Sequence, residues 1–139
     1  MSVRVIAVGY DHSRDAARAA RFAFDLGAAT GASVVVVHAV GLREHYAGAA
    51  PGADLPAELA DLADEAGLDL ARLSWRVEDG DACSVLLRAA HEPLGADLVV
   101  VGSRGRGEHA GLLLGSTSLE LAERCAVPLV IVPAPRDAD

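Results

Sequence analysis

Glycine and hydroxyl residues gather after an apolar run in the second half of the chain. The run LVVVG ends at Gly102, and Gly105 and Gly115 follow, the latter directly before Ser116 and Thr117. Glycine lets a backbone turn sharply and approach a ligand closely. The first N–H groups of a helix have no partner within the helix and, with the helix dipole, attract anions such as phosphate. These residues in this order predict a phosphate cradle between a strand and a helix.

The spacing differs from two common phosphate-binding motifs. It is not G-x-G-x-x-G after the first strand, and the chain has no lysine, which the Walker A motif requires, because all 12 of its positive side chains are arginine. A phosphate site here must use backbone N–H groups, hydroxyls and either arginine, such as Arg104, or a metal ion. From the spacing alone, a glycine-rich surface loop before an ordinary helix is an open alternative.

The composition predicts one globular domain spanning residues 1–139. The chain is 52% hydrophobic and 4% aromatic, so its core should consist mainly of Val, Leu, Ile and Ala. The net charge of −8 argues against nucleic-acid binding, which usually requires a basic surface. We expect no membrane span and no signal peptide, and therefore a cytoplasmic protein. Cys83 and Cys125 are expected to be buried free thiols.

Five short apolar runs alternate with four helical patterns. The runs predict strands within 3–9, 33–40, 71–81, 96–102 and 128–133. Helices are expected from Ser13 to Gly31, from Pro56 to Gly67, from Asp81 to near Pro93 or Gly95, and after Gly115. The first helix should bury one face, formed by Ala16, Ala19, Ala20, Ala23, Phe24 and Ala28. Residues 41–55 are expected to form a mobile loop and residues 134–139 a frayed tail.

This alternation predicts an α/β fold, a doubly wound five-stranded parallel sheet with helices on both faces, of the Rossmann-like type. Ligands of such sheets bind beyond the carboxyl ends of the strands, where the strand order reverses. The predicted strands end at Gly9–Asp11, at His38–Val40 and from Gly102 onward. We therefore expect these three segments to open onto one edge of the sheet.

The pattern Gly102-x2-Gly105-x9-Gly115-Ser116 resembles the nucleotide-binding signature of the universal stress protein family. Four other segments are similar to that family in register, namely VIAVGYDHS, VVVVHAV, VEDGDACSVLLRAA and VPLVIVP. The resemblance covers the whole chain. It implies the fold of the adenine nucleotide alpha hydrolase-like proteins and a site for ATP.

The resemblance also implies a role for individual residues. Asp11 matches an acidic residue near the adenosine or the metal, which is Mg²⁺ or Mn²⁺ bound with the nucleotide. Gly9 and Tyr10 match the segment that borders the base, and Ala39 matches a position whose backbone contacts adenine. The turn around the ribose and phosphates is matched by Val101, Gly102, Arg104 and Gly105, and the triphosphate cradle by Gly115, Ser116 and Thr117.

The sequence departs from the family's pattern in three places. His12 replaces the usual glycine of an Asp-Gly-Ser turn but leaves Asp11 and Ser13 in place. Thr117 stands where valine is common. The segment between the second and third strands is short for the family, which bears on nucleotide affinity more than on the identity of the site.

The remaining histidines do not form a catalytic pattern with other residues, and we assign no catalytic residue. His38 ends a buried strand, where a structural bond to a neighbouring loop is expected. His45 and Tyr46 lie in the predicted loop and should face solvent, and His109 falls within the glycine segment.

The function favoured is a cytoplasmic ATP-binding module of the stress response. The resemblance implies a homodimer through the last strand, Leu129–Val132, and regulatory protein partners that change with nucleotide occupancy. ATP hydrolysis should be slow at most, because no general base is evident.

Two alternative functions are open. One is an adenine-nucleotide hydrolase or transferase, with Asp11 holding metal and Arg104 or His109 stabilising phosphate charge. The other is an interaction protein without nucleotide.

Overall fold

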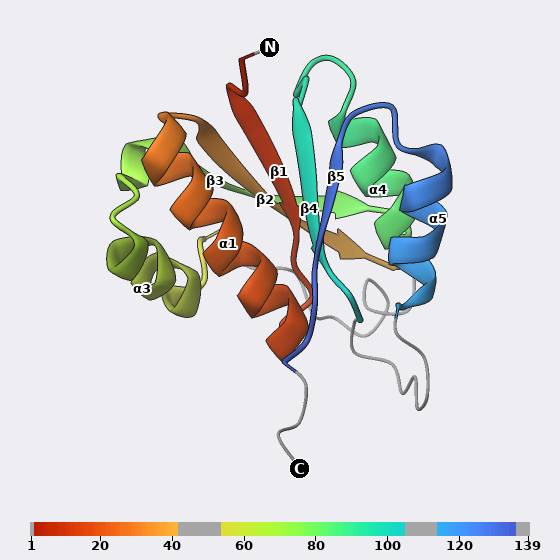
Figure 1. Ribbon diagram of the computed structural model, residues 1–139, viewed down its shortest axis with the longest axis horizontal. Coiled ribbons are helices and arrows are strands. Elements are labelled where there is room, and N and C mark those ends of the chain that lie inside the picture. Colours follow the sequence, from red (N-terminus) through yellow and green to blue (C-terminus); the bar gives the residue numbers. More distant parts are fainter. Residues whose placement is uncertain (1, 42–53, 105–113, 136–139) are drawn as a thin grey trace.

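A parallel sheet forms the centre of the computed structural model, which describes residues 2–41, 54–104 and 114–135 (Figure 1). The strands are β1 (Val5–Gly9), β2 (Ser33–Val40), β3 (Leu73–Asp79), β4 (Leu98–Gly102) and β5 (Leu129–Val132), in the order β3-β2-β1-β4-β5. The helices are α1 (Arg14–Thr30), α3 (Ala57–Ala66), α4 (Ala82–Ala89) and α5 (Ser116–Arg124), with a short 3-10 turn at Leu70–Arg72. The predicted doubly wound α/β fold is confirmed.

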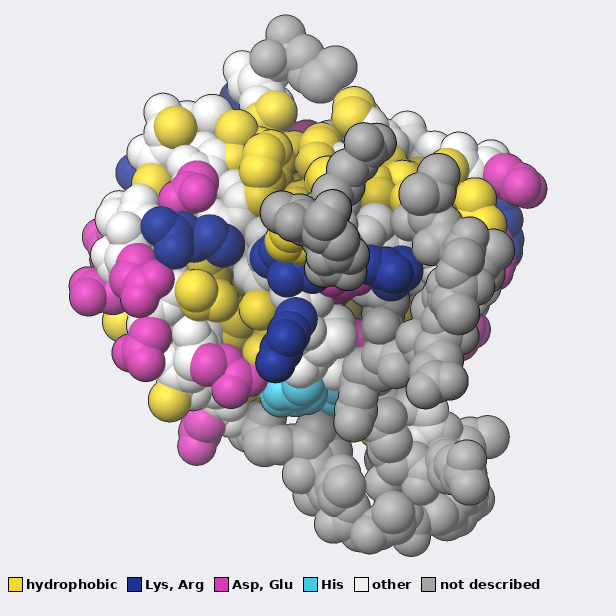
Figure 2. Space-filling view, turned by 60° about the horizontal axis from the view of Figure 1, so that its bottom comes forward, with side chains coloured by type: hydrophobic (Ala, Val, Ile, Leu, Met, Phe, Trp, Pro, Cys, Tyr) yellow, Lys and Arg dark blue, Asp and Glu magenta, His cyan; other side chains and the backbone are white. Residues whose placement is uncertain are grey.

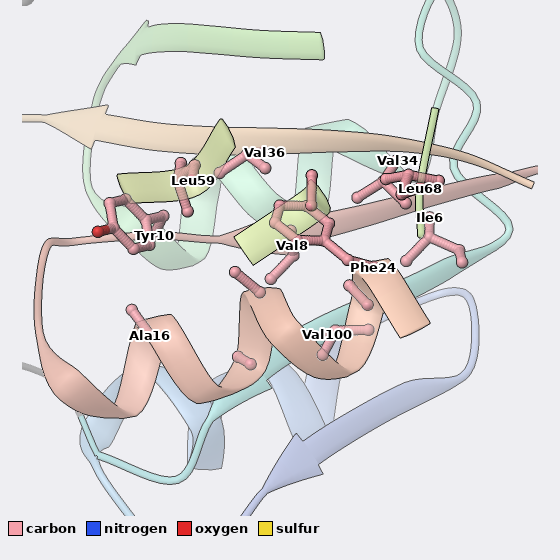
Figure 3. Packing of buried hydrophobic residues seen from close by; sticks show 14 of the residues in the cluster. Ile6, Val8, Tyr10, Ala16, Phe24, Val34, Val36, Leu59, Leu68 and Val100 are labelled. Carbon is pink, nitrogen blue, oxygen red and sulfur yellow. The ribbon is translucent and has the colours of Figure 1, made fainter. Parts of the chain in front are cut away.

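Alternate residues of the central strands pack into two separate cores. In β2, Val34 and Val36 are buried with α1 and α3, whereas Val35 and Val37 are buried with α4 on the other face. Figure 3 shows the first core, in which Phe24 of α1 lies against Ile6, Val8 and Val100 of the sheet. Because side chains of a strand alternate between its two faces, a run of four valines supplies both layers at once.

Helix α1 begins and packs as its sequence predicts, except at one position. The Ser13 hydroxyl accepts a hydrogen bond from the Ala16 N–H at 3.1 Å and caps the helix. The expectation that Ala28 is buried is wrong, since it is exposed and Gly27 is buried in its stead. A Cβ on Gly27 would lie 2.8 Å from a methyl carbon of Val34. The helix therefore lies close to β2 at Gly27, and Ala28 turns outward.

Helix α4 ends earlier than the sequence predicts, at Ala89 and not near Pro93 or Gly95. The residue before a proline disfavours helical backbone, so a helix tends to stop ahead of it. The Gly95 N–H donates to the His91 carbonyl at 2.9 Å, and the Ala96 N–H donates to the Ala89 carbonyl at 2.8 Å. These bonds close a turn that redirects the chain into β4.

Two predicted irregular segments fall mostly outside the described residues. Of the loop expected at 41–55, only Gly41, Asp54 and Leu55 are described, and of the tail expected at 134–139, only residues 134 and 135. Among the helices within the described ranges, none has the length and apolar character that crossing a membrane requires.

Asp97, which directly precedes β4, links the beginning of that strand to the beginning of β1 through hydrogen bonds. One oxygen of its carboxylate accepts hydrogen bonds from the backbone N–H groups of Arg4, at 2.8 Å, and Val5, at 3.0 Å. These two donors hold the pKa of the Asp97 carboxyl below its ordinary value. The ionised form therefore stabilises the register of the two central strands.

We expect Asp97→Ala to lower the melting temperature at neutral pH and to matter less in acid. A carboxylate whose folded-state pKa is lowered contributes stability above its unfolded pKa and loses it as the pH falls through the folded pKa. Thermal unfolding of the wild type and the variant between about pH 7 and about pH 3 measures the difference. Asp61→Ala, at an exposed position of α3, is the control. A difference that is constant over this range would contradict the expectation.

Candidate functional site

A cavity of about 280 Å³ opens at the carboxyl ends of β1 and β4. From β1 the chain builds β2 and β3 on one side of the sheet, and then crosses to build β4 and β5 on the other. The carboxyl ends of strands diverge at such a reversal of strand order and leave a crevice. The cavity therefore lies where this topology places ligands.

The structure brings the site residues predicted from the sequence to this cavity. Those that it describes all line the cavity, namely Gly9, Tyr10, Asp11, Ala39, Val101, Gly102, Arg104, Gly115, Ser116 and Thr117. Gly105 lies outside the described residues, as do His45, Tyr46 and His109. Four segments that are distant in sequence thus meet at one edge of the sheet, which the parallel topology requires.

Several lining residues were missed by the sequence reasoning. They are Ala16, Val37, Ala82, Val85, Leu86 and Ser118. Three of these belong to α4, whose apolar side chains form one wall of the cavity. In the sequence they look like any buried face of a helix, and only the crossover connection that sets α4 against β1 and β2 gives them a second role. No local signal could have identified these three α4 residues as part of a site.

The N-terminus of α5 opens onto the cavity without a side-chain cap. The first residues of α1 and α4 are capped by Ser13 and Asp81, but the residue before α5 is Gly115, which has no side chain. The Gly115 N–H itself donates to the Ser103 carbonyl at 2.6 Å. The N–H groups that follow, in Ser116 and Thr117, are at the helix positions that lack intrahelical partners. This end of α5 can therefore receive an anion.

Two serine hydroxyls tie the end of β4 to its neighbours, one to the beginning of α5 and the other to the segment after β5. The Ser118 hydroxyl donates to the Gly102 carbonyl at 2.8 Å, and both Ser118 and Ser103 are buried. The Ser103 hydroxyl accepts a bond from the Ala134 N–H at 3.2 Å, beyond β5. The Ser118 bond thus fixes the distance between the end of β4 and the beginning of α5, which are the two sides of the predicted phosphate cradle.

Positive charge reaches the rim of the cavity through Arg104. Its Nε lies 3.8 Å from a carboxylate oxygen of Asp15, and the other oxygen of Asp15 pairs with Arg18. Asp15 is 8% exposed and lies in the first turn of α1. Figure 2 presents the edge with the carboxyl ends of the strands, where arginine side chains gather although the chain is acidic overall. Asp15 anchors Arg104 beside the cavity.

Among the residues that the structure describes, Asp11 is the carboxylate that lines the cavity. One of its oxygens accepts a hydrogen bond from the Ser13 N–H at 3.0 Å. Mg²⁺ in nucleotide sites is commonly held by one or two carboxylates together with phosphates and water. Within the described ranges no cluster of three or more His, Cys, Asp or Glu side chains could hold a metal by itself. The donor set fits Mg²⁺ or Mn²⁺ only if phosphates complete the coordination.

Aromatic and imidazole rings pack behind the turn that carries Asp11. The His38 Nδ1 lies 2.8 Å from the Tyr10 carbonyl oxygen, so this nitrogen carries the proton and donates. The structural role expected for His38 is confirmed. The His38 ring also stacks on Trp75, with centroids 5.8 Å apart. Burial, followed by a hydrogen bond to Glu58, raises the pKa of the Tyr10 hydroxyl far above its ordinary value, which keeps Tyr10 a neutral donor.

Known proteins with related sequences are universal stress proteins. One from Mycobacterium tuberculosis strain H37Rv is 35% identical over 68 residues, which are 49% of this chain and 24% of that protein. One from Mycolicibacterium smegmatis is 44% identical over 57 residues, which are 41% of this chain and 18% of that protein. The matched segments thus span a quarter or less of these relatives.

Matches to solved structures cover nearly the whole length of this chain. A universal stress protein in complex with cAMP is 30% identical, with a TM-score of 0.72, and the match covers 95% of this chain and 98% of that one. A universal stress protein from Archaeoglobus fulgidus in complex with dAMP shares the fold at 19% identity, with a TM-score of 0.68 and coverage of 95% and 99%. The model of the universal stress protein family matches residues 2–133. This chain, by its fold and by a match over nearly its whole length, belongs to the universal stress protein family.

Proposed function

We propose that the cavity between β1 and β4 binds an adenine nucleotide. The observation that carries this proposal is the uncapped N-terminus of α5, which opens onto the cavity with the Ser116 and Thr117 hydroxyls. Apolar side chains of α4 line the same cavity. A site with one apolar and one anion-binding side suits a base joined to phosphate. The relative at 30% identity in complex with cAMP supports the same ligand class.

We further propose ATP as the ligand, with Mg²⁺ or Mn²⁺. Phosphates at the beginning of α5 would meet backbone N–H groups and hydroxyls, and Arg104 would contribute positive charge at the rim. When bound, the metal would neutralise phosphate charge, with Asp11 as its protein ligand. The adenine would lie between the ends of β1 and β2, where Gly9 and Ala39 line the cavity.

The proposed role is regulatory, in a stress response in the cytoplasm, with hydrolysis that is slow at most. Nucleotide occupancy would change the surface offered to other proteins. We also propose a homodimer through β5, since this strand is at the edge of the sheet and its four residues are all partly exposed. Pairing with a second copy would cover an apolar edge that is otherwise prone to aggregation.

Titration calorimetry with ATP, AMP and cAMP, each with and without Mg²⁺, tests the ligand and the role of Asp11. We expect Asp11→Ala to weaken Mg·ATP binding about tenfold, because the metal loses its carboxylate, and to change binding of metal-free ATP less. Asp25→Ala, further along α1, is the matched control.

Mass spectrometry of small molecules released from the purified protein checks the ligand independently. A protein that releases no nucleotide and gives no binding heat with any of the three would refute the proposed function. Multiple turnovers of ATP that disappear in Asp11→Ala would favour a hydrolase.

A further inference from the structure

A single carboxylate on α3 contacts both residues that flank Asp11. The Tyr10 hydroxyl donates to Glu58 Oε1, and the His12 Nδ1 lies 3.2 Å from the same oxygen. The sequence separations are 48 and 46 residues, so these bonds depend on the tertiary fold. No local pattern in the sequence singles out Glu58.

Glu58 reaches the turn from the opposite layer of the molecule. The apolar wall of the cavity belongs to the core on the α4 side, whereas Tyr10 and the neighbouring Leu59 belong to the core on the α3 side. Leu59 is 0% exposed and lies beside Tyr10 (Figure 3). Leu59 thus anchors the first turn of α3, which places the Glu58 carboxylate over the Tyr10–His12 segment even though the Glu58 side chain is 57% exposed.

The turn needs external support because of its backbone. His12 has φ of 66°, in the left-handed region that favours glycine and costs other residues about 1 kcal/mol or more. Its ring makes edge contacts with Tyr10, at 4.9 Å between centroids, and with His38, at 5.2 Å. The contact with Glu58 adds a hydrogen bond to a charged acceptor. Together these contacts offset the strain of a histidine at a position suited to glycine.

We infer that Glu58 is a positioning residue of the nucleotide site, which holds the Asp11 turn in place through hydrogen bonds to Tyr10 and His12. This inference rests on the proposed function. Asp11 lies between the two bonded residues, and its own carboxylate is oriented by the Ser13 N–H within the same turn. Loosening either neighbour of Asp11 would misplace the carboxylate that lines the cavity.

The test compares Glu58→Ala and Glu58→Gln with Glu65→Ala. Glu65 is also on α3 and also bonds to another element, through Arg21 on α1 at 3.1 Å, whereas Glu58 bonds to the two residues that flank Asp11. Two quantities are measured, the Kd for Mg·ATP and the amide resonance of Ser13 in nucleotide-free protein. The Ser13 resonance reports the Asp11 turn directly, so it separates positioning from a general loss of stability.

We expect Glu58→Ala to raise the Kd about five- to tenfold, less than the full effect of a hydrogen bond to a charged group because Glu58 acts on the ligand only through the turn, and to shift the Ser13 resonance. Glu58→Gln keeps an oxygen acceptor and should recover most of the affinity. Glu65→Ala should change neither quantity. In a His12→Gly background the turn is no longer strained, so Glu58→Ala should have a smaller effect there.

The outcomes separate this inference from the proposed function. If the wild type binds ATP and Glu58→Ala behaves like Glu65→Ala in both measurements, the role of Glu58 is refuted and the nucleotide site stands. If the wild type binds no nucleotide, the proposed function fails and the effect on affinity fails with it. The Ser13 resonance would then still decide whether Glu58 sets the turn.

Discussion

Gly102→Ala is expected to lower the free energy of unfolding by about 3 kcal/mol and the melting temperature by about 10 °C. A Cβ at this position would lie 2.7 Å from the carbonyl oxygen of Asp15 and 2.8 Å from its carbonyl carbon. These are backbone atoms of the first turn of α1, which cannot move without shifting the helix. Because the φ of Gly102 is not in the left-handed region, the cost comes from this collision alone.

Gly41→Ala is the matched control for this substitution. Gly102 is the last residue of β4 and Gly41 directly follows β2, but a Cβ on Gly41 would meet no atom within 4 Å. The melting temperature of Gly41→Ala should stay within about 1–2 °C of the wild type, since surface substitutions usually change the free energy of unfolding little. Chemical denaturation followed by circular dichroism gives both free energies. Equal stability of the Gly102 and Gly41 variants would show that α1 yields at its first turn.

Gly115→Val is expected to weaken ATP binding about a hundredfold with little loss of stability. Gly115 has φ of −76° and ψ of 167°, which valine adopts readily, and an unfavourable N-cap residue costs about 1 kcal/mol. The added side chain would crowd the beginning of α5, where we propose that phosphates bind. Excluding a phosphate from two N–H groups would cost two charge-assisted hydrogen bonds, which together correspond to about a hundredfold in Kd.

Titration calorimetry with Mg·ATP measures this effect, and thermal unfolding checks the fold. Ala122→Val, on the exposed face of the same helix, adds the same kind of side chain away from the cavity and should bind like the wild type. Equal ATP affinity in the Gly115 variant and the wild type would place the phosphates elsewhere.

The physical reasons for a glycine at positions 102 and 115 therefore differ, although both residues belong to one sequence pattern. Gly102 is needed because α1 lies against the end of β4, whether or not a ligand is bound. Gly115 is proposed to be needed because a side chain would occupy the ligand's place. Stability and affinity measured on both variants distinguish these reasons.

Much of the architecture could be predicted from the sequence because its signals are local. The four valines of β2 and the alternation of Leu73, Trp75 and Val77 in β3 reflect burial on both faces and on one face of a sheet. Ser13 and Asp81 mark helix starts because a cap is a bond between neighbours in sequence. The rule that parallel strands end at one edge of the sheet predicted that the three strand-end segments would meet, whereas the individual site residues within them came from the family resemblance.

What the tertiary structure alone decided depends on distances between segments far apart in the chain. Sequence periodicity could not tell that α1 approaches β2 at Gly27 and turns Ala28 away, because both positions fit a helical face. The second role of Val85 and Leu86, as a wall of the cavity, required knowing against which strands α4 packs. The bonds from Glu58 to Tyr10 and His12 join residues nearly fifty positions apart. A residue's own sequence neighbourhood determines its preferred backbone, but only the fold determines which side chain it meets.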